Sequence, residues 1–202
     1  MPRNSGQRNA EKSREAILQA AEGLFARKGT RRVSLAEIAK QAGVSRGLPS
    51  YFFHNKGTVS RMVMEGAAER VRRSVLDPIR SFPQTNPSQI LSELIDRYID
   101  YLAANPYVVK LLHWDALERT AERKTRQPPN IPANVLLEAV EVLAERVGKK
   151  RIGGMDIIDL LRSIVAMCLF PFQHSPPSGL AFVQQHKRHI KKFVLRAIKE
   201  RK

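Results

Sequence analysis

The chain has 202 residues, of which 35 are Lys or Arg and 19 are Asp or Glu, so its formal net charge is +16. Hydrophobic residues make up 43%, which is typical of a folded protein with a sizeable core and excludes global disorder. The excess charge lies at the two ends, with net +7 in residues 1–60, +2 in residues 61–130 and +7 in residues 131–202. This distribution favours a polyanionic partner, nucleic acid or an anionic membrane surface, although solubility alone is an alternative reason for it.

Cysteine content and hydropathy exclude further classes. The single cysteine, Cys168, forms no intrachain disulfide, so a disulfide-stapled secreted domain is excluded. The first 14 residues have no apolar segment of the kind that a signal peptide needs. The most apolar run, Ile164–Phe172, is too short to span a membrane. We therefore expect a soluble, cytoplasmic protein.

Apolar residues recur at helical spacing from residue 12 onward. Residues 1–11 are polar and basic and are predicted to form a flexible arm. In the first predicted helix the apolar face is formed by Ile17, Ala20, Ala21, Leu24 and Phe25. Gly29 is predicted to end this helix, with basic residues in its last turn.

Two short helices are predicted next. Ser34 and Glu37 have the spacing of a capping box, which begins the second helix, and Gly43 ends it. Ser45 is predicted to be the N-cap of the third helix. Together these features form two short helices joined by a tight glycine turn.

The rest of the chain is also predicted to be helical, without strand alternation. Prolines and glycines divide it into segments, and Pro171 is predicted to break the eighth helix. The predicted segments are residues 55–80, 88–104, 106–126, 134–147, 156–170 and 180–202. The fold class is therefore all-α, with about nine helices.

Residues 34–53 (SLAEIAKQAGVSRGLPSYFF) have the pattern of a helix-turn-helix motif. The second helix of such a motif enters the DNA major groove. The residues predicted to face base edges are Arg46, Gly47, Leu48, Ser50 and Tyr51. Arg46 is the candidate for a bidentate contact with guanine. The residues predicted to contact phosphates are Ser34, Ser45, Tyr51 and Lys56.

This part of the chain resembles the tetracycline-repressor (TetR) family of bacterial transcription regulators. The matching residues are Ile17-Leu18, Ala20-Ala21, Leu24-Phe25, Gly29, Val33-Ser34, Ile38-Ala39, Ala42 to Ser45, Tyr51 to Phe53 and Asn55-Lys56. A weaker similarity to the C-terminal domain of the family covers Asn105-Pro106 and residues 111–117. Pro49 and Ser50 stand where the family usually has an apolar residue and a tyrosine.

The resemblance implies a helix-turn-helix DNA-binding domain over residues 12–58 and an effector-binding and dimerisation domain over residues 59–202. It implies a homodimer formed through the last two helices, residues 156–170 and 180–200. The apolar surfaces of these two helices independently favour dimerisation over packing within one chain. The expected partners are a double-stranded DNA operator and a small-molecule effector, with no membrane.

Aromatic and polar residues of the second domain are candidates for an effector pocket between helices. They are Tyr98, Tyr101, Tyr107, His113, Trp114, Met167 and Phe170. Core packing is the alternative for each of them. His186 and His189 are three positions apart, a spacing that permits both to bind one metal ion. Their basic neighbours favour a solvated helix face instead, so no metal or cofactor is predicted.

Three functions are compatible with these features of the sequence. The favoured prediction is a homodimeric repressor that a small molecule releases from a near-palindromic operator. A DNA-binding architectural protein would need the same helix-turn-helix and no effector pocket. An enzyme is less favoured, because no phosphate loop, nucleophile elbow or dinucleotide fingerprint occurs in the sequence.

Overall fold

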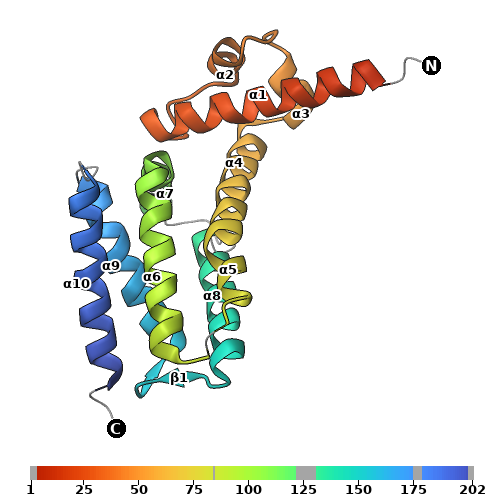
Figure 1. Cartoon of the computed structure of the whole chain (residues 1–202). Coiled ribbons are helices and arrows are strands. Elements are labelled where there is room, and N and C mark those ends of the chain that lie inside the picture. The colour runs from red at the N-terminus through yellow and green to blue at the C-terminus, as the bar shows by residue number, and fades with distance from the viewer. Residues whose placement is uncertain (1–3, 84, 122–130, 175–178, 200–202) are drawn as a thin grey trace. The chain divides into compact units, whose positions relative to one another are not determined.

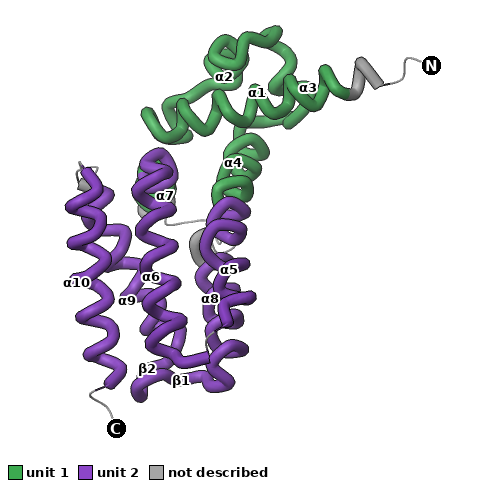
Figure 2. The backbone as a smooth tube through the Cα atoms, viewed as in Figure 1, with its two compact units in different colours: residues 1–67, 110–126 green, residues 68–109, 127–202 purple. Residues whose placement is uncertain are grey.

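The computed structural model of the chain describes residues 4–83, 85–121, 131–174 and 179–199. The chain divides into two compact units (Figure 2). The first unit consists of Met1–Ala67 and Lys110–Arg126, and the second of Ala68–Val109 and Gln127–Lys202. The predicted DNA-binding domain, residues 12–58, lies within the first unit. No pattern in the sequence indicates that residues 110–126 belong with the N-terminal part.

Helices form nearly all of the described chain, which confirms the predicted all-α class (Figure 1). They are α1 (Asn4–Lys28), α2 (Leu35–Ala42), α3 (Leu48–Phe53), α4 (Lys56–Val71), the π-helical segment η1 (Arg72–Leu76), α5 (Asp77–Arg80), α6 (Pro87–Ala104), α7 (Pro106–Ala121), α8 (Ile131–Val147), α9 (Ile157–His174) and α10 (Leu180–Lys199). Because α4, η1 and α5 follow one another without a break, the described residues form nine helical stretches, as predicted.

Helix α1 begins earlier than the sequence pattern predicted. Residues 4–11 are helical, so the predicted flexible arm over residues 1–11 is wrong for these residues, and residues 1–3 lie outside the described chain. Residues 7–12 are mostly good helix formers, and no proline interrupts them. The hydroxyl of Ser13 also donates to the carbonyl of Asn9 at 2.9 Å. The helix therefore extends beyond its apolar face.

The core of the first unit joins α1, α2 and α3. Ile17, Ile38 and Phe53 are each at most 1% exposed and come from these three helices. The guanidinium of Arg14 lies over the ring of Phe53, 5.4 Å from its centroid. Burial of this apolar surface stabilises two helices, α2 and α3, that are too short to be stable alone.

A π-helical segment, η1, interrupts the long helix that begins with α4. The N–H of Asp77 donates to the carbonyl of Arg72, five residues earlier. Pro78 follows directly; it has no N–H, and its ring would clash with the carbonyl of Ser74 in a regular α-helix. The wider turn accommodates this proline, and the helix continues as α5.

The second unit is built around α6, which packs against α9, α10 and η1. Two ion pairs fix α10 on α6. Lys187, only 7% exposed, lies 2.6 Å from Asp100, and Lys191 lies 2.7 Å from Asp96. A buried lysine is tolerated only with such a partner, so these pairs define the register between the two helices.

Between α8 and α9 the chain forms a small hairpin, although no strand was predicted from the sequence. Its strands are β1 (Arg151–Ile152) and β2 (Met155–Asp156), paired antiparallel with Arg151 opposite Asp156. A Cβ at Gly153 would lie 2.5 Å from the Cα of Ile198. The hairpin therefore packs on the last turn of α10 at a distance that only glycine allows.

Helix α9 continues through Pro171 to His174, so the predicted break at Pro171 is wrong. A proline in a helix leaves the carbonyl four residues earlier, here that of Met167, without its N–H donor. Packing holds the helix through this point: Cys168 and Phe172, on either side of Pro171, are buried, and the ring of Phe172 contacts that of His186 on α10 edge-on, with 6.4 Å between centroids. Because this contact comes from a neighbouring helix, the sequence alone could not show it.

Candidate nucleic-acid interface

The two ends of α2 are capped as the sequence predicted. The hydroxyl of Ser34 accepts a hydrogen bond from the N–H of Glu37 at 3.1 Å. Gly43 ends the helix in the left-handed conformation, with φ of +67°. The carboxylate of Glu37 pairs with Lys28 of α1 at 2.6 Å, and this hydrogen bond holds the pKa of Glu37 below its ordinary value. The first helix of the motif is therefore fixed at both ends.

Helix α3 begins at Leu48, and its N-cap is Gly47 rather than the predicted Ser45. The carbonyl of an N-cap residue accepts from the N–H four residues later, and for Ser45 that residue would be Pro49, which has none. The carbonyl of Ser45 instead accepts from Leu48 at 3.0 Å in a turn, and Gly47 accepts from Tyr51 at 3.0 Å. Pro49 thus delays the start of the helix.

The residues predicted to face base edges lie along this turn and α3. Arg46, Gly47 and Ser50 are exposed, and Tyr51 is 76% exposed. Leu48 is half-buried, so it also contacts the protein. Arg46 and Gly47 precede the helix instead of lying in its first turn. The surface therefore consists of a turn followed by a short helix, both held from behind by buried Phe53.

The predicted phosphate contacts lie around the same surface. Ser45 is exposed, and the hydroxyl of Ser34 keeps its own proton for donation while it caps α2. The ammonium of Lys56 donates to the carbonyl of Arg31 at 3.2 Å. Tyr51 contacts the ring of Phe52 edge-on, with 5.3 Å between centroids. These groups are donors that could bind phosphate oxygens.

A strained turn joins α3 to α4. The N–H of Asn55 donates to the carbonyl of Phe53 at 2.7 Å, and the residue between them, His54, has φ of +64° and ψ of −50°. This is a γ-turn of the positive-φ kind, which is rare and strained. Among the described non-glycine residues only His54 has a positive φ. Such strain persists where the surrounding structure fixes the chain on both sides.

The first unit also contains contacts between residues far apart in the chain. The carboxylate of Glu118 on α7 accepts hydrogen bonds from the hydroxyl of Thr30 and from the N–H of Arg31, the latter at 3.1 Å. These residues are 88 and 87 positions from Glu118 in the chain. Sequence reasoning missed Glu118, because no local pattern, periodicity or motif links residues at that separation.

The candidate effector residues are divided between the units. Two belong to the first, where His113 is exposed and Trp114 lies against Gly29. Those of the second unit are Tyr98, Tyr101, Tyr107, Met167 and Phe170. Burial, with smaller effects of Cys168 and Tyr101, raises the pKa of the Tyr98 hydroxyl. Phe170 is 63% exposed. Tyr98 therefore lies near Cys168 and Tyr101, whereas Phe170 faces outward.

The other groups considered from the sequence lie in the second unit. Cys168 is fully buried, and burial raises the pKa of its thiol to about 12. His186 is stacked on Phe182, with 6.0 Å between ring centroids, so it is not on a freely solvated face. Within the described ranges, no three His, Cys, Asp or Glu side chains are grouped to hold a metal ion. None of the helices described has the length and apolar character needed to cross a membrane.

A helix-turn-helix with an exposed second helix, followed by a separate helical unit, is the architecture of a one-component DNA-binding regulator. The family profile described as "Bacterial regulatory proteins, tetR family" matches residues 17–59. The profile described as "Tetracyclin repressor-like, C-terminal domain" matches residues 87–190. The chain belongs to the TetR family of transcriptional regulators.

Individual relatives agree with this assignment. The chain is 32% identical to the HTH-type transcriptional repressor SCO4008 of Streptomyces coelicolor over 163 residues, 79% of this chain and 78% of that protein. It is 32% identical to the repressor BepR of Brucella suis over 96 residues, 48% of this chain and 46% of BepR. A TetR family member of S. coelicolor, SCO1917, has a similar fold, with a TM-score of 0.71 at 19% identity over 92% of this chain and 98% of that one. The protein is therefore a DNA-binding transcriptional regulator.

Proposed function

We propose that the protein is a cytoplasmic, homodimeric repressor, without enzymatic activity, that binds a near-palindromic operator and is released from it by a small molecule. The observation that carries this proposal is the exposed surface formed by Arg46, Ser50 and Tyr51 on a helix-turn-helix whose opposite side is buried. Two such surfaces related by two-fold symmetry would enter major grooves on one face of DNA, roughly 34–36 Å apart or a multiple of that.

In this proposal the surface has two kinds of contact. The residues that face base edges are Arg46, Gly47, Leu48, Ser50 and Tyr51. The residues that bind phosphates are Ser34, Ser45, Tyr51 and Lys56. Arg46 is the residue with bidentate capacity, so it should contribute most to base preference. Lys56 should contribute equally to the affinity for every DNA sequence, because a phosphate contact carries no sequence information.

The two roles are separable by titration at several salt concentrations. Arg46→Ala should weaken binding to the operator by roughly ten- to a hundredfold and relax base preference at one position of each half-site. Lys56→Ala should weaken binding to every sequence. It should also make the salt slope, the dependence of log affinity on log salt concentration, shallower by the amount of about one phosphate contact. Arg61→Ala is the matched control, since Arg61 pairs with Glu65 along α4 at 3.0 Å. Unchanged affinity and base preference in Arg46→Ala would exclude the proposed reading residue.

The proposed dimer surface lies on α9 and α10. One face of α10, at helical spacing, is formed by Phe182, His186, His189 and Phe193. It lies beside the buried face, which is formed by Val183, Lys187, Ile190 and Val194. Phe193 is 60% exposed, and Phe170 on α9 is 63% exposed. A hollow of about 420 Å³ lies between Phe182 and Lys192 on this face. Exposed aromatic residues of this kind mark a protein–protein interface.

A charge on this face should separate the protomers. Phe193→Glu should shift sedimentation from dimer to monomer at micromolar concentration and weaken operator binding, because a dimer binds both half-sites. Gln184→Glu adds the same charge at an exposed position on another side of α10 and should remain dimeric. A wild-type protein that sediments as a monomer at that concentration would contradict the proposed assembly.

For the effector, the proposed site lies in the second unit near Tyr98, Tyr101 and Met167. Tyrosine hydroxyls on apolar rings suit a small molecule with both aromatic and polar parts. A panel of metabolites and drugs should include one that raises the melting temperature and lowers operator affinity, because coupling between the two sites is reciprocal. An architectural DNA-binding protein would show neither effect with any compound.

A further inference from the structure

The connection between α1 and α2 lies against α7 in the first unit. The hydroxyl of Thr30 and the N–H of Arg31 both donate to the carboxylate of Glu118. An ionised carboxylate that accepts two hydrogen bonds holds its donors more firmly than neutral acceptors do. The connection is therefore tied to α7 through two consecutive residues.

Arg31 also binds α7 through its side chain. Its Nη2 donates to the backbone carbonyl of Glu118 at 3.1 Å. Arg31 therefore binds Glu118 through its backbone N–H and its guanidinium at the same time. Hydrogen bonds that involve a charged donor or acceptor are stronger than those between neutral groups.

Gly29 makes this approach possible. It has φ of +77°, and a Cβ at this position would lie 2.9 Å from Oε1 of Glu118 and 3.0 Å from Cε3 of Trp114. A side chain here would force the side chains of Glu118 and Trp114 out of their positions against the connection. The carbonyl of Arg31 is held on its other side by Lys56, the first residue of α4, at 3.2 Å. Residue 31 is thus fixed between α7 and α4, three positions before the N-cap of α2.

We propose that Glu118 is a positioning residue for DNA binding, which holds the α1–α2 connection and, through it, α2 and α3, without touching DNA. The inference rests on the DNA-binding function and on the proposed contact surface around Arg46. It also means that the DNA-binding unit is incomplete without α7. A simple charge argument predicts the opposite effect for this residue, because removing a carboxylate from a polyanion-binding unit strengthens DNA binding.

The positioning role predicts weaker DNA binding in Glu118→Gln, whereas the charge argument predicts stronger binding, so this variant distinguishes them. With full-length protein and a duplex that the wild type selects, we expect Glu118→Gln to bind about tenfold more weakly, the effect of losing charged hydrogen bonds. The salt slope should be unchanged, because no phosphate contact is lost. Glu65→Gln removes the same charge from α4 in the same unit and should bind equally or more tightly.

Substitution of Thr30 is a second, smaller change, made on the other side of the contact with Glu118. Thr30→Val should weaken binding, Thr30→Ser should restore it, and Thr30→Val should add little to Glu118→Gln in a double-mutant cycle. Trp114 is the only tryptophan of the chain, so its emission reports on the packing against Gly29 in each variant. If Glu118→Gln does not fold, Thr30→Val carries the test alone.

The inference is overturned if Glu118→Gln binds as tightly as the wild type or more tightly, or if a folded Thr30→Val keeps full affinity. A wild-type protein that selects no sequence would instead contradict the proposed recognition surface. A shallower salt slope in Glu118→Gln would also overturn the inference, since it would mean that phosphate contacts had been lost.

Discussion

The ring of His186 on α10 contacts that of Phe172 on α9 edge-on, with 6.4 Å between the centroids, one residue beyond the proline within α9. This contact ties together the two helices that are proposed to form the dimer. It also packs α9 against α10 just past Pro171, where the helix lacks one of its own hydrogen bonds. The contact is lost when the ring is replaced, so His186 links the packing of α9 to the proposed interface.

Burial lowers the pKa of His186, the nearby His189 adds to this, and the neighbouring backbone of Cys168 and Met167 opposes it. The unfolded chain then binds a proton more readily than the folded one, so His186 makes the protein less stable as pH falls below about 6.5, its ordinary value. We expect the melting temperature of the wild type to fall between pH 7.5 and 5.5. His186→Gln should show a smaller decrease; an equal decrease would contradict the assignment.

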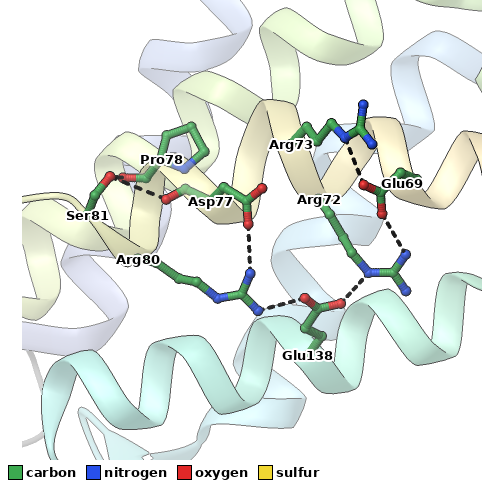
Figure 3. Close-up of polar contacts among 8 residues, drawn as sticks. All are labelled: Glu69, Arg72, Arg73, Asp77, Pro78, Arg80, Ser81 and Glu138. Atoms are coloured by element: carbon green, nitrogen blue, oxygen red, sulfur yellow. Dashed lines mark hydrogen bonds and ion pairs between the residues drawn. The ribbon is translucent and has the colours of Figure 1, made fainter.

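Glu138 on α8 links the two sides of the π-helical segment (Figure 3). Its carboxylate lies 2.5 Å from Nε of Arg72 and 2.6 Å from Nη2 of Arg80. Burial pushes the pKa of Glu138 up, but the hydrogen bonds from Arg72 and then Arg80 outweigh it and hold the pKa below 4.5. A lowered carboxyl pKa stabilises the fold above 4.5, and this contribution is lost as pH falls through the folded value.

Glu138→Gln should therefore destabilise the protein at pH 7 by about 1 kcal/mol, because one oxygen can no longer accept a charged hydrogen bond. The difference between variant and wild type should shrink below pH 4.5. Urea unfolding at pH 7 and at pH 4 measures both effects. Asp159→Asn, at an exposed ion pair within α9, is the control and should change stability little at either pH. A pH-independent difference would show that charge is not the cause.

Substitution of two glycines with similar φ distinguishes the effect of backbone strain from that of steric overlap. A Cβ at Gly43 would meet open space, whereas a Cβ at Gly29 would meet Glu118 and Trp114. Gly43→Ala should cost about 1 kcal/mol, the penalty for alanine in the left-handed region. Gly29→Ala should cost about 1–3 kcal/mol more, because overpacking is added to strain. Equal losses in chemical denaturation would mean that α7 does not approach Gly29 closely.

The γ-turn at His54 predicts a stabilising substitution. A non-glycine residue in such a conformation costs about 1–3 kcal/mol, and glycine relieves this at an entropic cost of about 0.5–1 kcal/mol. His54→Gly should therefore raise the free energy of unfolding by about 1 kcal/mol. His54→Ala keeps the strain and should show no such gain. A His54→Gly variant less stable than His54→Ala would exclude a strained turn here.

Local chemistry explains which features are predictable from the sequence. Ser34 and Gly43 are correctly predicted caps because capping depends on neighbouring residues alone. The prediction of Ser45 as a cap is wrong because Pro49, four positions later, withholds the N–H that an N-cap needs. The prediction of a break at Pro171 is wrong because the contact that packs α9 just past the proline, between Phe172 and His186, comes from another helix. Glu118 is missed for a similar reason: its partners are adjacent only after folding.

The most direct test of the proposed function is selection of bound sequences from random DNA by the full-length protein. We predict one enriched motif with inverted half-sites, whose centres lie on one face of the duplex, and loss of its base preference in Arg46→Ala. Binding that falls steeply with salt but enriches no sequence would contradict a regulator that reads an operator, and would favour an architectural protein instead.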